Sequence, residues 1–168
     1  STLASYGEGT YEARPDIVYV SLGVQRDGYT AQEAQEALRK DVSKLIEVLR
    51  QQGLNDDTIK TDSYSLYPVY RTKKLSDTET EEEISKYRAY VRLMCEIYKI
   101  ADAGKLVDAA IKSGANRVES MDFAVKDQSA VKKEALRRAM TAAQDKARLI
   151  AEQFGVVLVK PSSISEST

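Results

Sequence analysis

Residues 87–97 read Tyr-Arg-Ala-Tyr-Val-Arg-Leu-Met-Cys-Glu-Ile, and their apolar and polar side chains alternate with a period of two. One face of such a run carries its apolar members: Tyr87, Ala89, Val91, Leu93, Cys95 and Ile97. Successive side chains of a strand point to opposite faces of a sheet, so the run predicts a strand with one face in the core.

Two further runs predict strands that accompany this one. Residues 17–25 alternate in the same way, with four apolar residues on one face: Val18, Val20, Leu22 and Val24. Residues 58–71 are expected as a strand that contains Pro68, and because proline has no amide N–H this strand is expected at a sheet edge or a bulge. The polar, acidic residues 73–86 are expected to form the loop of a long β-hairpin.

Helix signals follow two of these strands. Thr30 predicts the start of a helix with a capping box, because the Glu33 side chain can bond back to the free amide at the cap. An apolar stripe with spacings of four and three then leads to Gly53. Asp102 is expected to cap a shorter helix that ends at Gly114.

The remaining segments complete an α+β order. Residues 129–154 predict a last helix whose apolar stripe faces the core and whose alanines allow close approach to a flat sheet. Residues 3–13 are expected to pair with the strand after them through a turn at 14–16, and residues 117–125 and 156–159 are expected as further strands. The order ββαββαβαβ indicates a mainly antiparallel sheet with helices packed on one face.

Bulk properties limit the architecture and the partners. The chain of 168 residues is long enough for one domain, or for two lobes, about 1–72 and 87–160, joined by the acidic loop 73–86. A net charge of −1 and a pI of about 5.7 predict no general affinity for nucleic acid. The longest apolar runs are too short for a transmembrane segment. No positively charged start followed by an apolar segment is present, as expected of a mature exported protein or of a shortened chain, so the lack of a signal peptide does not indicate the cytoplasm.

The side-chain inventory limits the chemistry. The chain contains no histidine and a single cysteine, Cys95, which lies within the alternating run. Without imidazole there is no Ser-His-Asp or Cys-His relay and no histidine-based metal site. The carboxylates, lysines and tyrosines form no recognisable catalytic constellation, so we expect a protein that is not an enzyme and has no cofactor.

Tyrosine is the unusual component, with ten tyrosines against two phenylalanines and no tryptophan. Five of them lie on the two arms of the expected hairpin: Tyr64, Tyr67, Tyr70, Tyr87 and Tyr90. One interpretation is an aromatic platform for a ligand or a partner chain. The other interpretation, which we favour, is that the tyrosines pair across strands on an amphipathic sheet surface. These five residues are the candidate interface or ligand site.

Other polar clusters have ordinary interpretations. Asn-Asp-Asp at 55–57 is typical of a turn and no calcium-loop spacing is present, so Asp56, Asp57 and Asp62 predict no metal site. A basic cluster near the last helix lacks interleaved aromatic residues, which favours a solvated face over a phosphate site. Its members are Lys126, Lys132, Lys133, Arg137 and Arg138.

Several segments, taken in chain order, resemble the SIMPL-domain family. They are Gly7-Glu8-Gly9 with Arg14-Pro15-Asp16 and Val18-Tyr19-Val20, Thr30-Ala31-Gln32-Glu33-Ala34, Gly53-Leu54 with Asp57, Ile59 and Thr61, the tyrosine–proline strand 64–70, and the alanine-rich last helix ending at Gly155. Members of the family usually continue past the polar tail 161–168 to a further alternating strand, which we expect to be missing here.

The resemblance implies a mostly bacterial, exported protein of the periplasm or cell envelope, similar to periplasmic immunogenic, outer-membrane-associated antigens. It also implies ring- or channel-like homo-oligomers, with a link to oxidative-stress defence in some members. We therefore expect a non-enzymatic envelope protein that acts through self-assembly or by binding another envelope protein. The alternative is a small-molecule or peptide binder that uses the tyrosine-rich hairpin. The family has no established catalytic residues to carry over.

Overall fold

The structure is a computed structural model that describes residues 1–167, and it confirms the α+β class. Its elements are β1 (Ile17–Gly28), α1 (Ala31–Gln51), β2 (Ile59–Lys74), β3 (Thr80–Ile97), a 3₁₀ turn (Ile100–Asp102), α2 (Ala103–Lys112), β4 (Arg117–Ala124) and α3 (Gln128–Phe154). They divide into two compact units. The sheet unit is Pro15–Lys126, and the α3 unit consists of Ser1–Arg14 and the chain from Asp127 onward.

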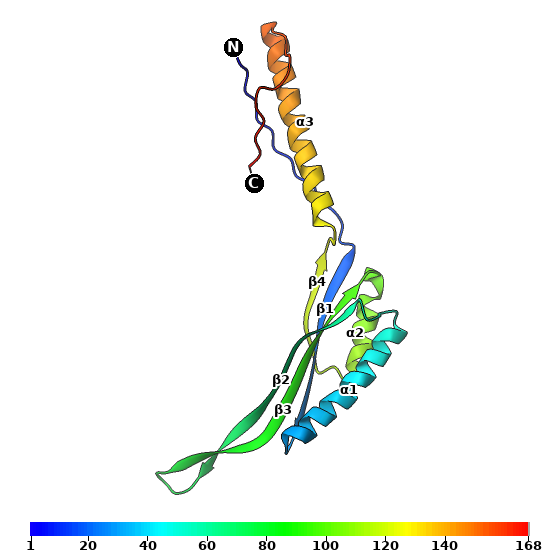
Figure 1. Ribbon diagram of the computed structural model, residues 1–168, viewed down its shortest axis with the longest axis vertical. Coiled ribbons are helices and arrows are strands. Elements are labelled where there is room, and N and C mark those ends of the chain that lie inside the picture. The colour runs from blue at the N-terminus through cyan, green and yellow to red at the C-terminus, as the bar shows by residue number, and fades with distance from the viewer. Residues whose placement is uncertain (168) are drawn as a thin grey trace. The chain divides into compact units, whose positions relative to one another are not determined.

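All four strands pair antiparallel in the order β2-β3-β1-β4. The alternating run of β3 lies next to β1, with Cys95 opposite Val20 and Val91 opposite Val24. Helices α1 and α2 cover one face of this sheet, as expected (Figure 1). Strand β2, which contains Pro68, is at the edge of the sheet, so that prediction is also confirmed.

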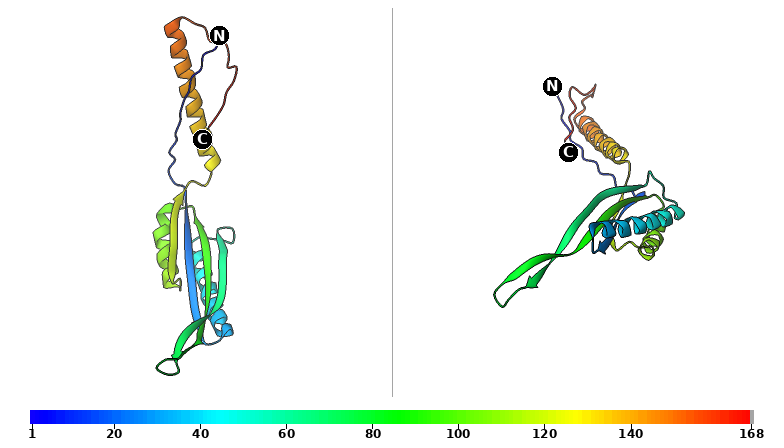
Figure 2. Two further views of the ribbon diagram at one scale, coloured as in Figure 1. Left: turned by 90° about the vertical axis from the view of Figure 1, so that its left-hand side faces the viewer. Right: turned by 60° about the horizontal axis from the view of Figure 1, so that its bottom comes forward.

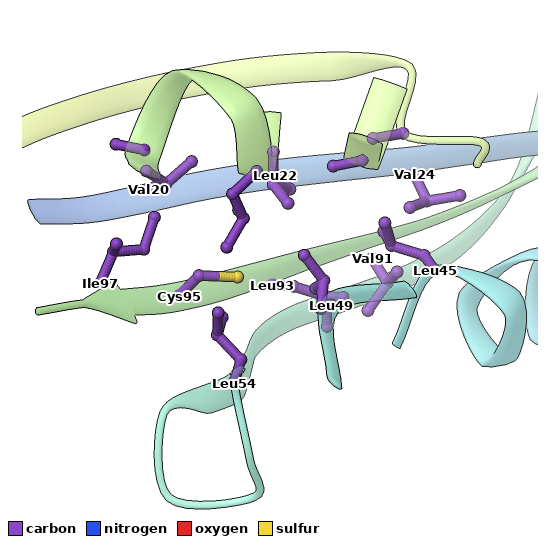
Figure 3. Close-up of a cluster of buried hydrophobic side chains, with 14 of the residues drawn as sticks. Val20, Leu22, Val24, Leu45, Leu49, Leu54, Val91, Leu93, Cys95 and Ile97 are labelled. Carbon is purple, nitrogen blue, oxygen red and sulfur yellow. The ribbon is translucent and has the colours of Figure 1, made fainter. Parts of the chain in front are cut away.

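The core of the sheet unit lies between this face and the helices (Figure 3). The inward residues of β1 and β3 are almost fully excluded from solvent, and α1 contributes a stripe that includes Leu45 and Leu49. Cys95 lies among these side chains and is 0% exposed. A fully buried Leu or Val side chain contributes about 1.5–3 kcal/mol relative to an exposed one, so this layer dominates the stability of the unit.

Helix α1 begins and ends close to the predicted residues. The Thr30 side chain accepts a hydrogen bond from the Glu33 amide at 3.1 Å. The Glu33 carboxylate accepts from the Tyr29 amide at 3.0 Å, one residue before the cap, which differs slightly from the predicted capping box. After the helix, Gly53 has φ of 99°, a conformation that favours glycine.

The predicted acidic loop is wrong, because the hairpin continues as paired strands almost to its end. Arg71 lies opposite Glu83 and Lys73 lies opposite Glu81, which leaves only residues 75–79 as the turn. Opposite charges on directly facing residues stabilise such a ladder. The boundaries of the two units also differ from the lobes 1–72 and 87–160, since β2 and β3 form one hairpin inside the sheet unit.

Residues 3–13 do not form the predicted strand. They run extended beside α3, and Gly7 and Gly9 touch the helix backbone so closely that a Cβ at Gly9 would lie 2.3 Å from the Ala135 carbonyl oxygen. The alanines of α3 therefore admit this segment, whereas we expected them to face a sheet. Residues 14–16 carry no turn, and the Asp16 amide instead donates to the Ala124 carbonyl at 3.0 Å.

Two further expectations are corrected and one is confirmed. Residues 156–159 are extended but belong to no strand, and Val157 is 88% exposed. The strand predicted at 117–125 is confirmed as β4, which ends one residue earlier at Ala124 and, as an edge strand, leaves Phe123 54% exposed. The Asp102 side chain makes no capping bond, since a 3₁₀ turn precedes α2.

The α3 stripe does not face a core. Within the described part of the α3 unit, Ala151 is the one buried apolar side chain, while Met140 is 45% exposed and Phe154 is 76% exposed. The helix does end as predicted, at Gly155 with φ of 63°.

Truncating the two helix stripes should therefore have unequal effects. Leu45→Ala should lower the free energy of unfolding by about 2–5 kcal/mol, because it opens a cavity in a packed core. Met140→Ala should cost clearly less, since almost half of this side chain already contacts water. Urea unfolding followed by circular dichroism measures both, and equal losses would contradict the placement of the α3 stripe.

Candidate functional site

The five candidate tyrosines do not share one face of the hairpin. Tyr67 lies opposite Arg88, on the face of the sheet that points away from α1 and α2, which we call the open face. Tyr90 lies on the same face. Tyr64 is opposite the buried Val91, and Tyr87 packs against the core, so both belong to the helix-covered face. Tyr70 lies beyond a register shift, in the outer part of the hairpin.

A shallow depression of about 370 Å³ lies on the open face around Tyr67 and Tyr90. Gly23 of β1 leaves the space beneath the Tyr90 ring, because a Cβ there would lie 3.1 Å from that ring and 3.1 Å from the Glu119 carboxylate. The depression also receives three arginines, one glutamine and one serine: Arg88, Arg92, Arg117, Gln25 and Ser65.

Charges in the depression are mostly neutralised by neighbours. The Arg92 guanidinium donates to Asp62 at 2.6 Å and lies 3.6 Å from Glu119. The Tyr90 hydroxyl donates to the Glu119 carboxylate. Arg117 has no ion pair among residues 1–167, so it is the cation most available to a ligand.

The depression was only partly visible in the sequence. The alternation of 87–97 already places Arg88, Tyr90 and Arg92 together, since all three have even numbers. Arg117 and Glu119 join them only through the pairing of β4 with β1, which no local pattern indicates.

Neither Tyr90 in this depression nor the buried Cys95 is poised for catalysis at neutral pH. Desolvation and the neighbouring Glu119 raise the pKa of Tyr90 to about 12. Burial raises the pKa of the Cys95 thiol to about 12, and this thiol lies on the opposite, helix-covered face. A general base is most effective with a pKa near the working pH, so neither group is suited to that role.

A carboxylate clamp fixes the hairpin to the end of β1. Asp27 accepts from the Arg88 guanidinium at 2.9 Å and lies 2.8 Å from the Lys86 ammonium. These two bonds, Arg88 first, lower the pKa of Asp27 to about 2. Pairing of β1 with β3 ends one residue later, where Gly28 is opposite Tyr87.

Beyond this clamp the hairpin continues alone, and we call residues 69–86 the arm. Figures 1 and 2 show it projecting from the sheet past the N-terminal end of α1. Three large apolar side chains in the arm are about half exposed: Tyr70 at 56%, Leu75 at 52% and Ile84 at 46%. The arm thus combines unpaired strand edges with exposed apolar surface, which is typical of an interaction site.

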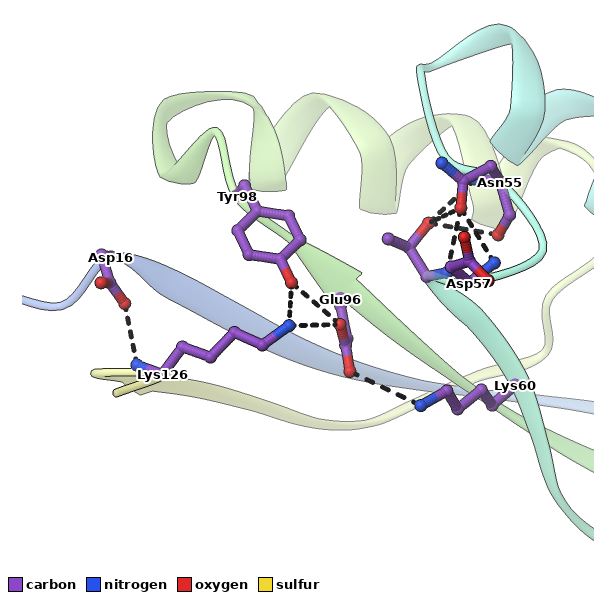
Figure 4. Close-up of polar contacts among 8 residues, drawn as sticks. Asp16, Asn55, Asp57, Lys60, Glu96, Tyr98 and Lys126 are labelled. Atoms are coloured by element: carbon purple, nitrogen blue, oxygen red, sulfur yellow. Dashed lines mark hydrogen bonds and ion pairs between the residues drawn. The ribbon is translucent and has the colours of Figure 1, made fainter. Parts of the chain in front are cut away.

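The remaining polar clusters fit structural roles (Figure 4). Asn55 accepts from the Asp57 amide at 2.9 Å, which confirms the predicted turn. Lys126, from the basic cluster, lies 3.3 Å from Glu96 and also contacts Tyr98. Within residues 1–167 no group of acidic or cysteine side chains is arranged to hold a metal ion, and no helix there is long and apolar enough to span a membrane.

Native Cys95 should resist thiol reagents. The side chain is fully buried and its pKa is raised, so little thiolate is available to react. We expect labelling by a maleimide to be much slower in buffer than in 6 M guanidinium, which exposes the thiol. Mass spectrometry of timed samples measures both rates, and equal rates would contradict the burial.

Loss of the Asp27 clamp should change the response to acid. A carboxyl whose folded-state pKa is lowered stabilises the fold above its unfolded pKa of 3.8, and this contribution is lost as the pH falls towards about 2. Asp27→Asn should therefore reduce stability at pH 7 and flatten the fall in stability between pH 4 and 2. Urea titrations at several pH values test this. The matched control is Asp77→Asn in the exposed turn, which should keep the parent profile.

The sequence is similar to known proteins over nearly its whole length. Residues 3–168 match the family SIMPL, described as "Protein of unknown function (DUF541)". The 26 kDa periplasmic immunogenic protein of Brucella melitensis biotype 1 is 29% identical over 164 residues, which cover 98% of this chain and 66% of that protein. The protein of the same name from Brucella abortus gives the same values.

A third relative, "Uncharacterized protein YggE" of Edwardsiella ictaluri, is 22% identical over 152 residues, covering 90% of this chain and 62% of that protein. The chain therefore spans just under two thirds of the length of the curated Brucella relatives. The family match extends over nearly all of the sequence and confirms the resemblance drawn from its motifs. The chain belongs to the SIMPL family.

Proposed function

We propose that this chain is a periplasmic protein that acts without catalysis, by associating with further copies of itself through the hairpin arm. Support for the location comes from the Brucella relatives, which are named periplasmic immunogenic proteins. The arm is the observation that carries the proposal, because within the described sheet unit it combines unpaired strand edges with exposed apolar side chains.

Strand pairing is the first argument. Among residues 1–167, no strand pairs with the outer edge of β3 over residues 80–86, since β1 reaches only Tyr87, and no strand lies on the outer side of β2. A two-stranded ribbon alone is at best marginally stable in water. A strand supplied by another copy would satisfy the free N–H and C=O groups and cover Tyr70 and Ile84.

The α3 unit independently supports association between copies, without bearing on the arm itself. Among its described residues almost no apolar side chain is buried. Leu149, Phe154 and Val159 are 66%, 76% and 90% exposed. Solvent-exposed apolar groups of this size are a liability in a monomer and are typical of surfaces that become covered. Association of copies would reduce this exposure.

A role in defence against oxidative stress, which the family resemblance implies, would then depend on the assembly. The one thiol of the chain is unsuited to it, because Cys95 is buried and its raised pKa keeps it protonated. Sensor cysteines are typically accessible and of low pKa.

Ligand binding on the open face is the second candidate function. The observation that favours it is the depression above Gly23, where Arg117 has no ion pair in the described residues and lies beside Tyr90. Such a site suits a small anion with a flat apolar part. Binding isotherms that depend on Arg117, with the protein monomeric throughout, would place this function first.

Shortening the arm tests the assembly. Tyr70 and Ile84 are directly paired, so replacing residues 71–83 by Asn-Gly joins them through a two-residue type I′ turn. We expect the parent to show a mass in light scattering that is a multiple of 18.7 kDa and the shortened variant to show a lower one. Circular dichroism serves as the control for the retained fold.

Tyr67→Ser is a matched control at the base of the hairpin. This tyrosine lies on the open face outside the arm, so the variant should keep the parent mass if the arm carries the contact. A shortened variant with the same mass as an oligomeric parent would remove the arm from the interface, and a monomeric parent would overturn the proposed function as a whole.

A further inference from the structure

We infer that the partner of each arm is the arm of a second copy. The two arms pair side by side through their free strand edges, so that the basic edge of one copy meets the acidic edge of the next. This rests on the proposed function and specifies its contact. Two features identify this partner: the two edges of the arm carry opposite charges, and both edges have unpaired backbone groups. One arm is therefore complementary to another.

The β2 edge of the arm is basic. Residues 69–74 carry three cations, Arg71, Lys73 and Lys74, and no acidic residue. Only two ion pairs engage them within the described chain: Arg71 with Glu83 at 2.7 Å and Lys74 with Asp77 at 3.6 Å. Pro68 lacks an amide donor at the base of this edge, so a new strand would pair with the part beyond it.

The β3 edge of the arm is acidic. Residues 79–83 carry four carboxylates, and three of them form no ion pair with any described residue: Glu79, Glu81 and Glu82. Lys73 is the cross-strand neighbour of Glu81, but no cation of the described residues lies within ion-pair distance of these three carboxylates. They repel one another and any added strand of the same charge. They are compatible with a neighbouring strand only if that strand brings cations opposite them.

A single arm carries both the basic β2 edge and the acidic β3 edge. Because the basic and acidic edges are on opposite sides of the same ribbon, the contact is heterologous and uses two different surfaces of each copy. Every copy then keeps one edge of each kind free for a further neighbour, which builds a ring or a line of copies. A two-fold contact is disfavoured, since it would place like charges together.

Charge reversal at each edge tests this directly. Variant A carries Lys73→Glu and Lys74→Glu, and variant B carries Glu79→Lys, Glu81→Lys and Glu82→Lys. Both keep the Arg71–Glu83 pair that stabilises the hairpin. Each variant alone has two edges of the same sign, so its mass in light scattering should fall towards 18.7 kDa. An equimolar mixture should recover the parent mass, because each edge again meets its opposite.

A combined variant with all five substitutions is the matched control. It reverses the polarity of the arm but restores opposite edges, so it should associate like the parent. Raising the salt concentration from 0.1 to about 1 M shortens the screening length from about 10 to 3 Å and should weaken all associating samples.

Parent mass retained by A and B separately would overturn the edge pairing. So would a mixture and a combined variant that both stay monomeric. Either result leaves the proposed function standing if the shortened arm still lowers the mass of an oligomeric parent.

Discussion

The pairing of β1 with β3 is the constraint on which the rest of the sheet unit depends. Both strands alternate, and their register brings the apolar faces together, with Leu22 opposite Leu93. A shift of one residue would turn an entire apolar set towards solvent, so burial fixes this register. Helices α1 and α2 cover the resulting face, and the polar residues of the same strands are left on the open face.

The unequal lengths of these two strands create the surface that we assign to function. Strand β1 ends at Gly28, whereas β3 begins seven residues before Tyr87, so the hairpin is supported on one side only at its base. Asp27 marks this transition, because it binds Arg88 and Lys86 one residue before the last pair of β1 and β3. The stable sheet thus holds a ribbon whose own edges are unsatisfied, which is a reasonable basis for recognition between copies.

The α3 unit uses small residues in place of a conventional core. Gly7 and Gly9 let an extended chain touch the helix backbone beside the alanines, where any larger side chain would collide. This explains why residues 3–13, with the composition of a strand, pair with no other strand in the described chain. Composition records the preference for extended backbone, but the partner of that backbone is chosen by long-range packing.

The sequence by itself determined the periodic features: the alternation of 87–97, the stripe of α1 with its cap at Thr30, the turn at Asn55 and the ends of helices at Gly53 and Gly155. These depend on neighbours in the chain. Only the tertiary structure decided which elements meet. It brought Arg117 beside Tyr90 and extended the acidic run into a paired strand. The reason is physical: periodicity specifies which side of an element is buried, whereas its partner and register follow from packing between segments far apart in the chain.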